Sequence, residues 1–158
     1  MRDDLIEKAG DVLRAAAEAA IMPRFRALAA HEVEEKTPGE WVAVADRQAE
    51  GMIAAGLAGL LPDSRVIGEE ACAADASLID ALADGTVWLV DPLDGTGNFA
   101  AGEPPFAVMA ALLVEGETVG AWMLDPVSGR LSAAERGGGA WRDGERIKTG
   151  SISPGPAE

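Results

Sequence analysis

The chain has 158 residues, 48% of them hydrophobic and 25% charged, a composition that excludes a disordered or repetitive protein. A chain of this length buries about two thirds of its unfolded surface and predicts one folded unit, which we assign to residues 1–150. Its 13 basic and 27 acidic residues give a net charge of −14, which repels a phosphate backbone and argues against nucleic acid as a partner.

The cysteine content and the two ends of the chain bear on where in the cell the protein is found. Residues 1–4 carry charges in place of the apolar run of a secretory signal, and the single Cys72 has no partner for an intramolecular disulfide. No apolar run approaches the ~20 residues that a membrane-spanning helix needs. We therefore expect a cytoplasmic protein with no membrane partner. Residues 151–158, which contain two prolines, predict a flexible tail.

Two helices are predicted in the first part of the chain. Small and apolar residues recur every three or four positions over residues 4–30, which predicts an amphipathic helix that Pro23 kinks or divides. Residues 41–45 predict a short strand that follows a turn-like stretch. A second helix is expected to begin at Asp46 and to end at residues 61–63, where a proline follows leucine.

The remainder of the chain predicts strands, with one short helix near residues 75–83. Apolar runs bounded by turn residues predict five strands, at 65–68, 86–90, 106–114, 118–124 and 131–134. The third and fourth runs are separated by Glu115-Gly116-Glu117, which indicates a hairpin. The triple glycine at 137–139 predicts a turn and not a phosphate loop, because no helical pattern follows it.

The segment with the clearest chemical content spans residues 88–99. An apolar strand delivers two carboxylates, Asp91 and Asp94, into a turn that contains Pro92 and Gly95. Ligands are often bound at such strand ends in α/β-type proteins. Because Asp, Pro and Gly are also common turn residues, the spacing alone is equally compatible with a turn that has no function.

A second acidic pair, Glu69-Glu70, also follows a predicted strand. Adjacent strands would bring Glu69 close to Asp91 and Asp94, where several carboxylates repel one another unless a cation neutralises them. Hard oxygen ligands in this number suit Mg²⁺, which also binds substrate phosphate. The two clusters together suggest a phosphoester hydrolase that uses two metal ions.

These residues resemble a known family. Gly68-Glu69-Glu70, followed by the motif Asp-Pro-Leu-Asp-Gly-Thr-Gly-Asn-Phe at residues 91–99, is similar to the paired metal-binding motifs of the inositol monophosphatase family. The resemblance covers nearly the whole chain. It implies an α+β layered sandwich with a mixed, mostly antiparallel sheet, the amino-terminal part of the sugar-phosphatase fold. It also implies a Mg²⁺-dependent phosphatase, with Mn²⁺ as an alternative cofactor, that acts on a small sugar or polyol phosphate.

The resemblance assigns the metal ligands one residue at a time. It implies that the Glu69 and Asp91 carboxylates and the Leu93 carbonyl bind the first metal. Asp94 would hold the second metal. Lys36 matches a family lysine near the metal waters, although a lone lysine in a turn is ordinarily just solvated.

The resemblance also implies the catalytic residues. Thr96 and Asp46 would orient a metal-bound water for in-line attack on phosphorus, with Glu70 as a supporting acid. The backbone N–H groups of Gly95 and Thr96 would bind the phosphate. Without the resemblance, Asp46 is better explained as the cap of the second helix.

Residues 100–158 contain no match to the family's second half, which holds a Trp-Asp motif and supplies another Asp to the second metal. We therefore expect either a homo-oligomer or a complementary carboxy-terminal half as partner, and exposed apolar groups at the edge of the sheet that this half would cover. Gly97 stands where many relatives carry a larger residue, and the phosphate ester stays open. The candidates are inositol phosphate, fructose bisphosphate, histidinol phosphate and adenosine bisphosphate. The competing hypothesis is a non-catalytic module that binds metal or phosphate.

Overall fold

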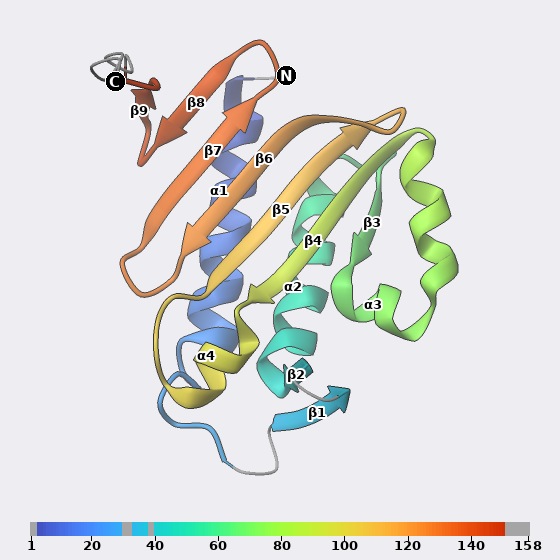
Figure 1. Ribbon diagram of the computed structural model, residues 1–158. Helices are drawn as coiled ribbons and strands as arrows, with labels where there is room; N and C mark the ends of the chain where they lie inside the picture. Colours follow the sequence, from blue (N-terminus) through green and yellow to red (C-terminus); the bar gives the residue numbers. More distant parts are fainter. Residues whose placement is uncertain (1–2, 30–32, 38–39, 151–158) are drawn as a thin grey trace, which may run out of the picture.

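One layer of the fold consists of two helices. The computed structural model describes residues 3–29, 33–37 and 40–150. Helix α1 (Asp3–Ala16) continues into a π-helical turn (Ala17–Ile21), and α2 (Val44–Leu60) lies against it (Figure 1). The helices approach closely because Gly56 of α2 lacks a side chain, and a Cβ atom there would lie 2.6 Å from Cγ1 of Val12.

The second layer is a seven-stranded sheet whose spatial order follows the chain order. Its strands are β3 (Arg65–Gly68), β4 (Thr86–Asp94), β5 (Ala107–Val114), β6 (Glu117–Asp125), β7 (Arg130–Glu135), β8 (Gly139–Arg142) and β9 (Glu145–Ile147). The pair β3 and β4 is parallel, and every other neighbouring pair is antiparallel. The predicted fold class, an α+β layered sandwich with a mixed, mostly antiparallel sheet, is therefore confirmed.

Several element boundaries differ from the sequence-based expectations. The first helix ends well before residue 30, because the chain turns at Pro23. A separate hairpin, β1 (Val33–Thr37) with β2 (Glu40–Ala43), surrounds the predicted turn, and α2 begins at Val44, before Asp46. The expected tail, 151–158, lies outside the described residues.

Two further differences concern the segment after β3 and the end of the chain. An unpredicted helix, α3 (Glu69–Ala74), starts directly after β3, and the helix expected near 75–83 is a 3-10 segment (Ala76–Ala83). Strands β8 and β9 were not predicted. A last helix, α4 (Thr96–Ala101), follows β4 and begins directly after Gly95.

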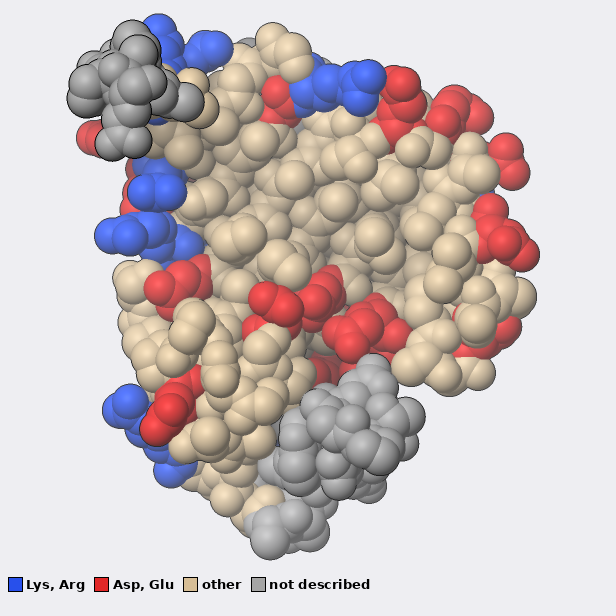
Figure 2. Space-filling model, in the orientation of Figure 1, with Lys and Arg blue, Asp and Glu red and all other residues tan. Residues whose placement is uncertain are grey.

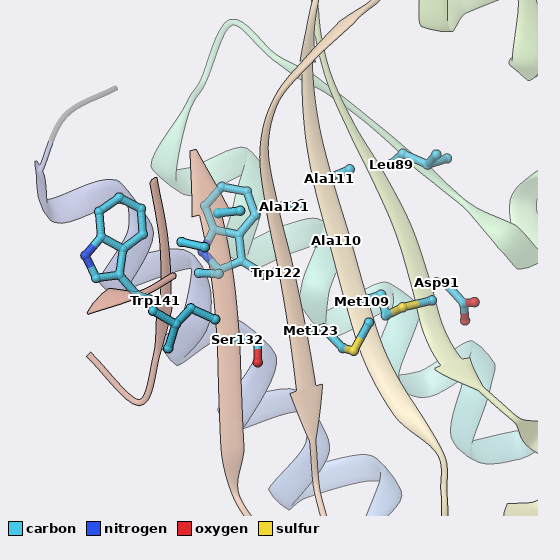
Figure 3. Close-up of a pocket in the computed structure, with 14 residues that line it drawn as sticks. Leu89, Asp91, Met109, Ala110, Ala111, Ala121, Trp122, Met123, Ser132 and Trp141 are labelled. Atoms are coloured by element: carbon cyan, nitrogen blue, oxygen red, sulfur yellow. The ribbon is translucent and has the colours of Figure 1, made fainter. Parts of the chain in front are cut away.

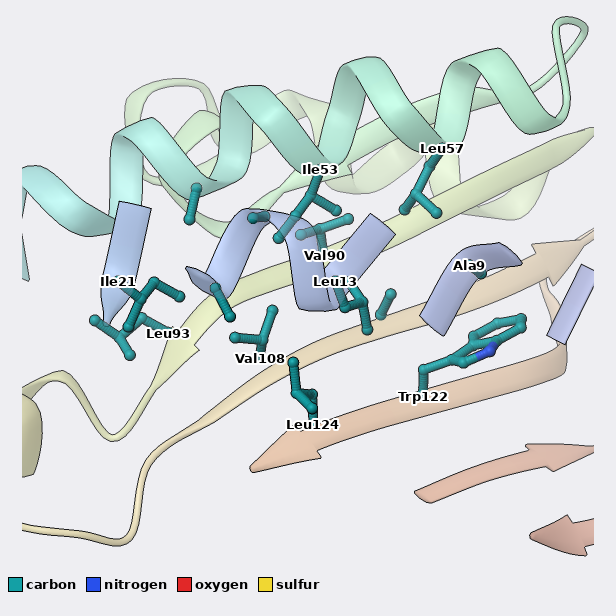
Figure 4. Close-up of a cluster of buried hydrophobic side chains, with 14 of the residues drawn as sticks. Ala9, Leu13, Ile21, Ile53, Leu57, Val90, Leu93, Val108, Trp122 and Leu124 are labelled. Carbon is teal, nitrogen blue, oxygen red and sulfur yellow. The ribbon is translucent and has the colours of Figure 1, made fainter. Parts of the chain in front are cut away.

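The hydrophobic core lies between the helices and one face of the sheet (Figure 4). Leu13 of α1 and Ile53 of α2 are fully buried against Val90 of β4 and Trp122 of β6. The indole N–H of Trp122 donates to the carbonyl of Ile6, at 2.9 Å, and ties the sheet to α1. No helix in the described ranges is both long enough and apolar enough to cross a membrane.

The opposite face of the sheet carries small and apolar side chains without a covering layer of helices in the described chain. We call it the open sheet face and define it by Leu89, Met109, Ala111, Ala121, Met123 and Ala134. A shallow pocket of about 430 Å³ lies on it, and Figure 3 shows Met109, Met123 and Asp91 along its rim. Met123 is 52% exposed, so this face presents an apolar surface to solvent.

Candidate metal centre

The candidate site begins where β4 leaves regular pairing. Asp91 pairs with Met109, but the register then shifts, and Asp94 pairs with Ala107. Pro92 lies in this irregular stretch, where its missing N–H costs no ladder hydrogen bond. The Asp91 side chain accepts the N–H of Leu93 at 3.1 Å, so Asp91 and the Leu93 backbone are held together.

Parallel pairing places the second acidic pair beside this stretch. Gly68 of β3 pairs with Val90 of β4, so Glu69 follows at the level of Asp91. The Asp91 carboxyl group shares a hydrogen bond with the Glu69 side chain. Figure 2 shows acidic side chains gathered below the wide uncharged surface of the sheet. Glu69 and Asp91, which the sequence placed on neighbouring strands, therefore do meet, although Glu69 and Glu70 begin α3 and do not end a strand.

The environment of this cluster shifts the pKa of Asp91. Burial, and then the negative charge of Glu69, raise the pKa of Asp91 from 3.8 to about 7. The N–H of Leu93 opposes the shift, and the charge of Asp94 adds to it. Burial and the neighbouring negative charges disfavour the ionised form of this carboxyl group. A nearby cation would stabilise that ionised form.

We expect Asp91 to make the cation-free protein less stable as the pH rises. Because its pKa is higher in the folded chain than in the unfolded chain, its contribution to stability is present below pH 3.8 and is lost as the pH rises to about 7. Discounted for its partial exposure, the loss is about 1–2 kcal/mol. The measurement is the melting temperature from pH 4 to 8, with chelator, of the native chain and Asp91→Asn. The melting temperature of the variant should rise relative to that of the native chain as the pH increases. A difference that stays constant with pH would contradict this assignment.

The predicted catalytic pair also meets. The Thr96 hydroxyl at the start of α4 lies 2.8 Å from the Leu93 carbonyl and 3.2 Å from Asp46 Oδ1, both of which it can donate to. Asp46 is only 1% exposed and is the third residue of α2, so it does not precede that helix as its N-cap would. Residues 50 positions apart are therefore joined next to the carboxylate cluster.

Gly95 connects the cluster to α4. Its φ of +84° is in the left-handed region, and a Cβ atom would lie 3.0 Å from the carbonyl oxygen of Pro105. Both features favour glycine at this position. Gly95 makes the tight turn between Asp94, at the end of β4, and Thr96, at the start of α4. The relative placement of these two residues therefore depends on Gly95.

Sequence reasoning missed one residue of the site, Glu50. Its carboxylate accepts the N–H groups of Glu70 and Ala71, and burial raises its pKa although these N–H groups lower it. The available signal was its spacing, because Glu50 lies four residues after Asp46 and thus on the same side of α2. Lys36 falls in β1, and its side chain is outside what the structure describes.

The comparisons with known proteins identify the family of the chain. A sequence model of the inositol monophosphatase family matches residues 2–155. The chain belongs to the inositol monophosphatase family. An inositol-1-monophosphatase of Rhizobium meliloti is 40% identical over 120 residues, which are 76% of this chain and 43% of that protein. The Nus factor SuhB of Vibrio cholerae is 34% identical over 77% of this chain and 43% of its own length.

A solved structure of the family gives the same result for the fold. The IMPase of Thermotoga maritima superposes with a TM-score of 0.78 at 28% identity, over 94% of this chain and 55% of its own. The chain thus spans less than half the length of the curated relatives it matches and about half of this structural relative.

The donor atoms of this family member suit a hard divalent cation. The Glu69, Asp91 and Asp94 carboxylates and the Leu93 carbonyl offer oxygen alone, which is the ligand type that Mg²⁺ and Mn²⁺ prefer. Among the described residues, no group of three or more Asp, Glu, His or Cys side chains is already gathered as a metal cage. The raised pKa of Asp91 nevertheless fits a site where a cation would replace a proton.

Proposed function

We propose that the chain is the amino-terminal, metal-binding part of a Mg²⁺-dependent phosphomonoesterase. The observation that carries the proposal is the hydrogen bond between Asp91 and Glu69 at one strand end, where burial and the charges of Glu69 and Asp94 raise the pKa of Asp91 to about 7. Clustered carboxylates of this kind repel one another, and a divalent cation relieves the repulsion. Mn²⁺ can take the same oxygen ligands.

In this proposal four residues hold the cations. Glu69, Asp91 and the Leu93 carbonyl bind the first, and Asp94 binds the second. When bound, such cations acidify water and offset charge on the attacking and leaving oxygen atoms. The hydrogen bond from the Leu93 N–H to Asp91 keeps the carboxylate and the adjacent carbonyl in a fixed relation.

The remaining site residues act on water and phosphate. Thr96 and Asp46, whose oxygen atoms lie 3.2 Å apart, would hold the attacking water, and the Asp46 carboxylate would accept its proton. The N–H groups of Gly95 and Thr96 would bind phosphate oxygen atoms. Glu70 follows Glu69 in the first turn of α3 and would act as a supporting acid.

The substrate is a small phosphorylated sugar or polyol in this proposal. Family membership leaves the ester open, because one relative carries the name inositol-1-monophosphatase and another the name Nus factor SuhB. Assays of several phosphomonoesters, among them inositol phosphate and fructose bisphosphate, would rank them by kcat/KM.

The open sheet face is the surface we propose for the partner. It is apolar, and the curated relatives are more than twice as long as the matched segment. A complementary carboxy-terminal polypeptide would cover this face and complete the second metal site. Analytical ultracentrifugation of the chain with and without that polypeptide tests this. Self-association of the isolated chain would indicate a homo-oligomer.

We expect the isolated 158-residue chain to hydrolyse phosphomonoesters poorly, and the complementary half to restore Mg²⁺-dependent turnover. The physical reason is that two-metal action stabilises both the attacking and the leaving oxygen, and in this proposal the complementary half supplies one ligand of the second metal. Phosphate release measured with Mg²⁺ and with chelator provides the test. A fast Mg²⁺-dependent rate from the chain alone would show that the second half is not needed.

The second candidate is a non-catalytic module that binds metal or phosphate. It is favoured by the match to only 43% of the curated relatives and by the relative that is named a Nus factor. Mg²⁺ binding without phosphate release, even in the presence of the complementary half, would support this candidate over the phosphatase.

A further inference from the structure

A carboxylate on α2 accepts hydrogen bonds from the first turn of α3. Glu50 Oε2 accepts the N–H of Glu70 at 2.8 Å, and Oε1 accepts the N–H of Ala71 at 3.2 Å. Both N–H groups belong to the first turn of α3, where a helix leaves its N–H groups without internal partners. Gly68, which precedes α3, has no side chain to accept them. Glu50 therefore takes the place of a local helix cap from a separate helix.

Gly68 makes room for this contact. A Cβ atom added at Gly68 would overlap the Glu50 carboxylate, and the three nearest atoms it would meet all belong to Glu50. The φ of Gly68 is −101°, a value that any residue adopts, so the backbone itself does not require glycine here. Glycine therefore leaves room for the carboxylate, which a larger residue here would displace.

The contacts with Glu50 fall on both sides of Glu69. Gly68 precedes Glu69 and touches the Glu50 carboxylate, and Glu70 follows it and donates to the same carboxylate. We propose that Glu50 is a positioning residue that fixes the backbone around Glu69 and so aims the Glu69 carboxylate at Asp91. The inference rests on the proposed metal-dependent function. Both Glu50 oxygen atoms accept N–H groups that follow Glu69 in the chain, so in this proposal Glu50 acts through the Glu69 backbone.

Loss of this contact should weaken cation binding more than it weakens the fold. Glu50→Gln keeps one carbonyl acceptor but turns an NH₂ group toward the other N–H, whereas Glu50→Ala removes both acceptors. We expect Mg²⁺ affinity, measured by calorimetry on the 158-residue chain, to fall about 10-fold in Glu50→Gln and more in Glu50→Ala, as for other residues that support metal ligands. Glu7→Gln, an exposed carboxylate on α1, is the matched control and should bind as the native chain does.

A double-mutant cycle isolates the contact. Gly68→Ala should also lower Mg²⁺ affinity, because its Cβ displaces the Glu50 carboxylate. In the Glu50→Ala background, Gly68→Ala should lower the Mg²⁺ affinity little further, because the carboxylate that the added Cβ would meet is absent. Additive losses from the two changes would overturn the inference.

A second readout does not need the cation. Amide hydrogen exchange at Glu70 and Ala71 in the cation-free chain should be slow in the native protein and faster in Glu50→Ala. A merely structural role predicts a lower melting temperature with unchanged Mg²⁺ affinity, and that result would overturn the proposal. If the native chain itself does not bind Mg²⁺, the proposed function fails and this inference fails with it. If the native chain and Glu50→Ala bind equally, the inference alone fails.

Discussion

Replacing Thr96 by alanine should slow phosphate release by about 100-fold or more in the enzyme assembled with its complementary half. The hydroxyl lies within hydrogen-bond distance of both the Leu93 carbonyl and Asp46, so it connects the metal-ligand segment to a buried carboxylate. Its proposed task is to orient water, which matters chiefly in the transition state. Turnover should therefore fall far more than stability does.

The matched control is Thr96→Ser, which keeps the hydroxyl and should keep most of the turnover. The structural alternative is that the hydroxyl only stabilises the turn before α4, in which case its loss would cost about 1 kcal/mol of folding free energy and leave the chemistry intact. Steady-state kinetics and thermal melting of the same two variants separate these roles. A lowered melting temperature with unchanged turnover would refute the catalytic role of Thr96.

Asp91→Asn should weaken Mg²⁺ binding by about 100-fold or more, at least as much as the loss of a residue that supports a metal ligand. Asparagine has nearly the same shape and can still accept the Leu93 N–H, so the change removes mainly the charge. The same substitution should raise the stability of the cation-free chain above pH 7, because the repulsion from Glu69 and Asp94 disappears. A variant that is more stable and yet binds the cation less well is the expected result.

Calorimetry of Mg²⁺ binding to the native chain, Asp91→Asn and Asp80→Asn would make this comparison. Asp80 lies exposed in the 3-10 segment (Ala76–Ala83), so its substitution changes the net charge by the same amount at a different place. Equal affinity in the native chain and Asp91→Asn would remove Asp91 from the metal site. A similar loss in both variants would indicate that only the overall charge of the protein matters.

Most of the fold followed from local patterns in the sequence. The apolar runs that became β3 to β7 are long enough, or alternate clearly enough, for their strands to be predicted. Strands β8 and β9 are only four and three residues long and carry no such pattern, so their pairing depends on β7. The first helix was predicted too long because its small residues continue toward Pro23, where the chain turns.

The candidate site was predicted only in part, because some of its contacts join residues that are far apart in the chain. Asp91, Asp94 and Thr96 stand in one contiguous motif, and neighbouring strands bring Glu69 to it, as the order of elements suggested. Helix α3 was missed because it is six residues long and is capped by Glu50. That contact joins residues 20 positions apart, and no local pattern encodes it.

We propose above all that the carboxylates of Glu69 and Asp91, with the Leu93 carbonyl, hold a divalent cation. Crystals of the chain grown with Mn²⁺ test this directly, because the anomalous scattering of manganese marks its position. We expect a peak bonded to these three oxygen donors at about 2.0–2.3 Å, close to the distances of Mg²⁺ sites. Density for Mn²⁺ only elsewhere on the acidic surface, or none at this strand end at saturating Mn²⁺, would contradict it.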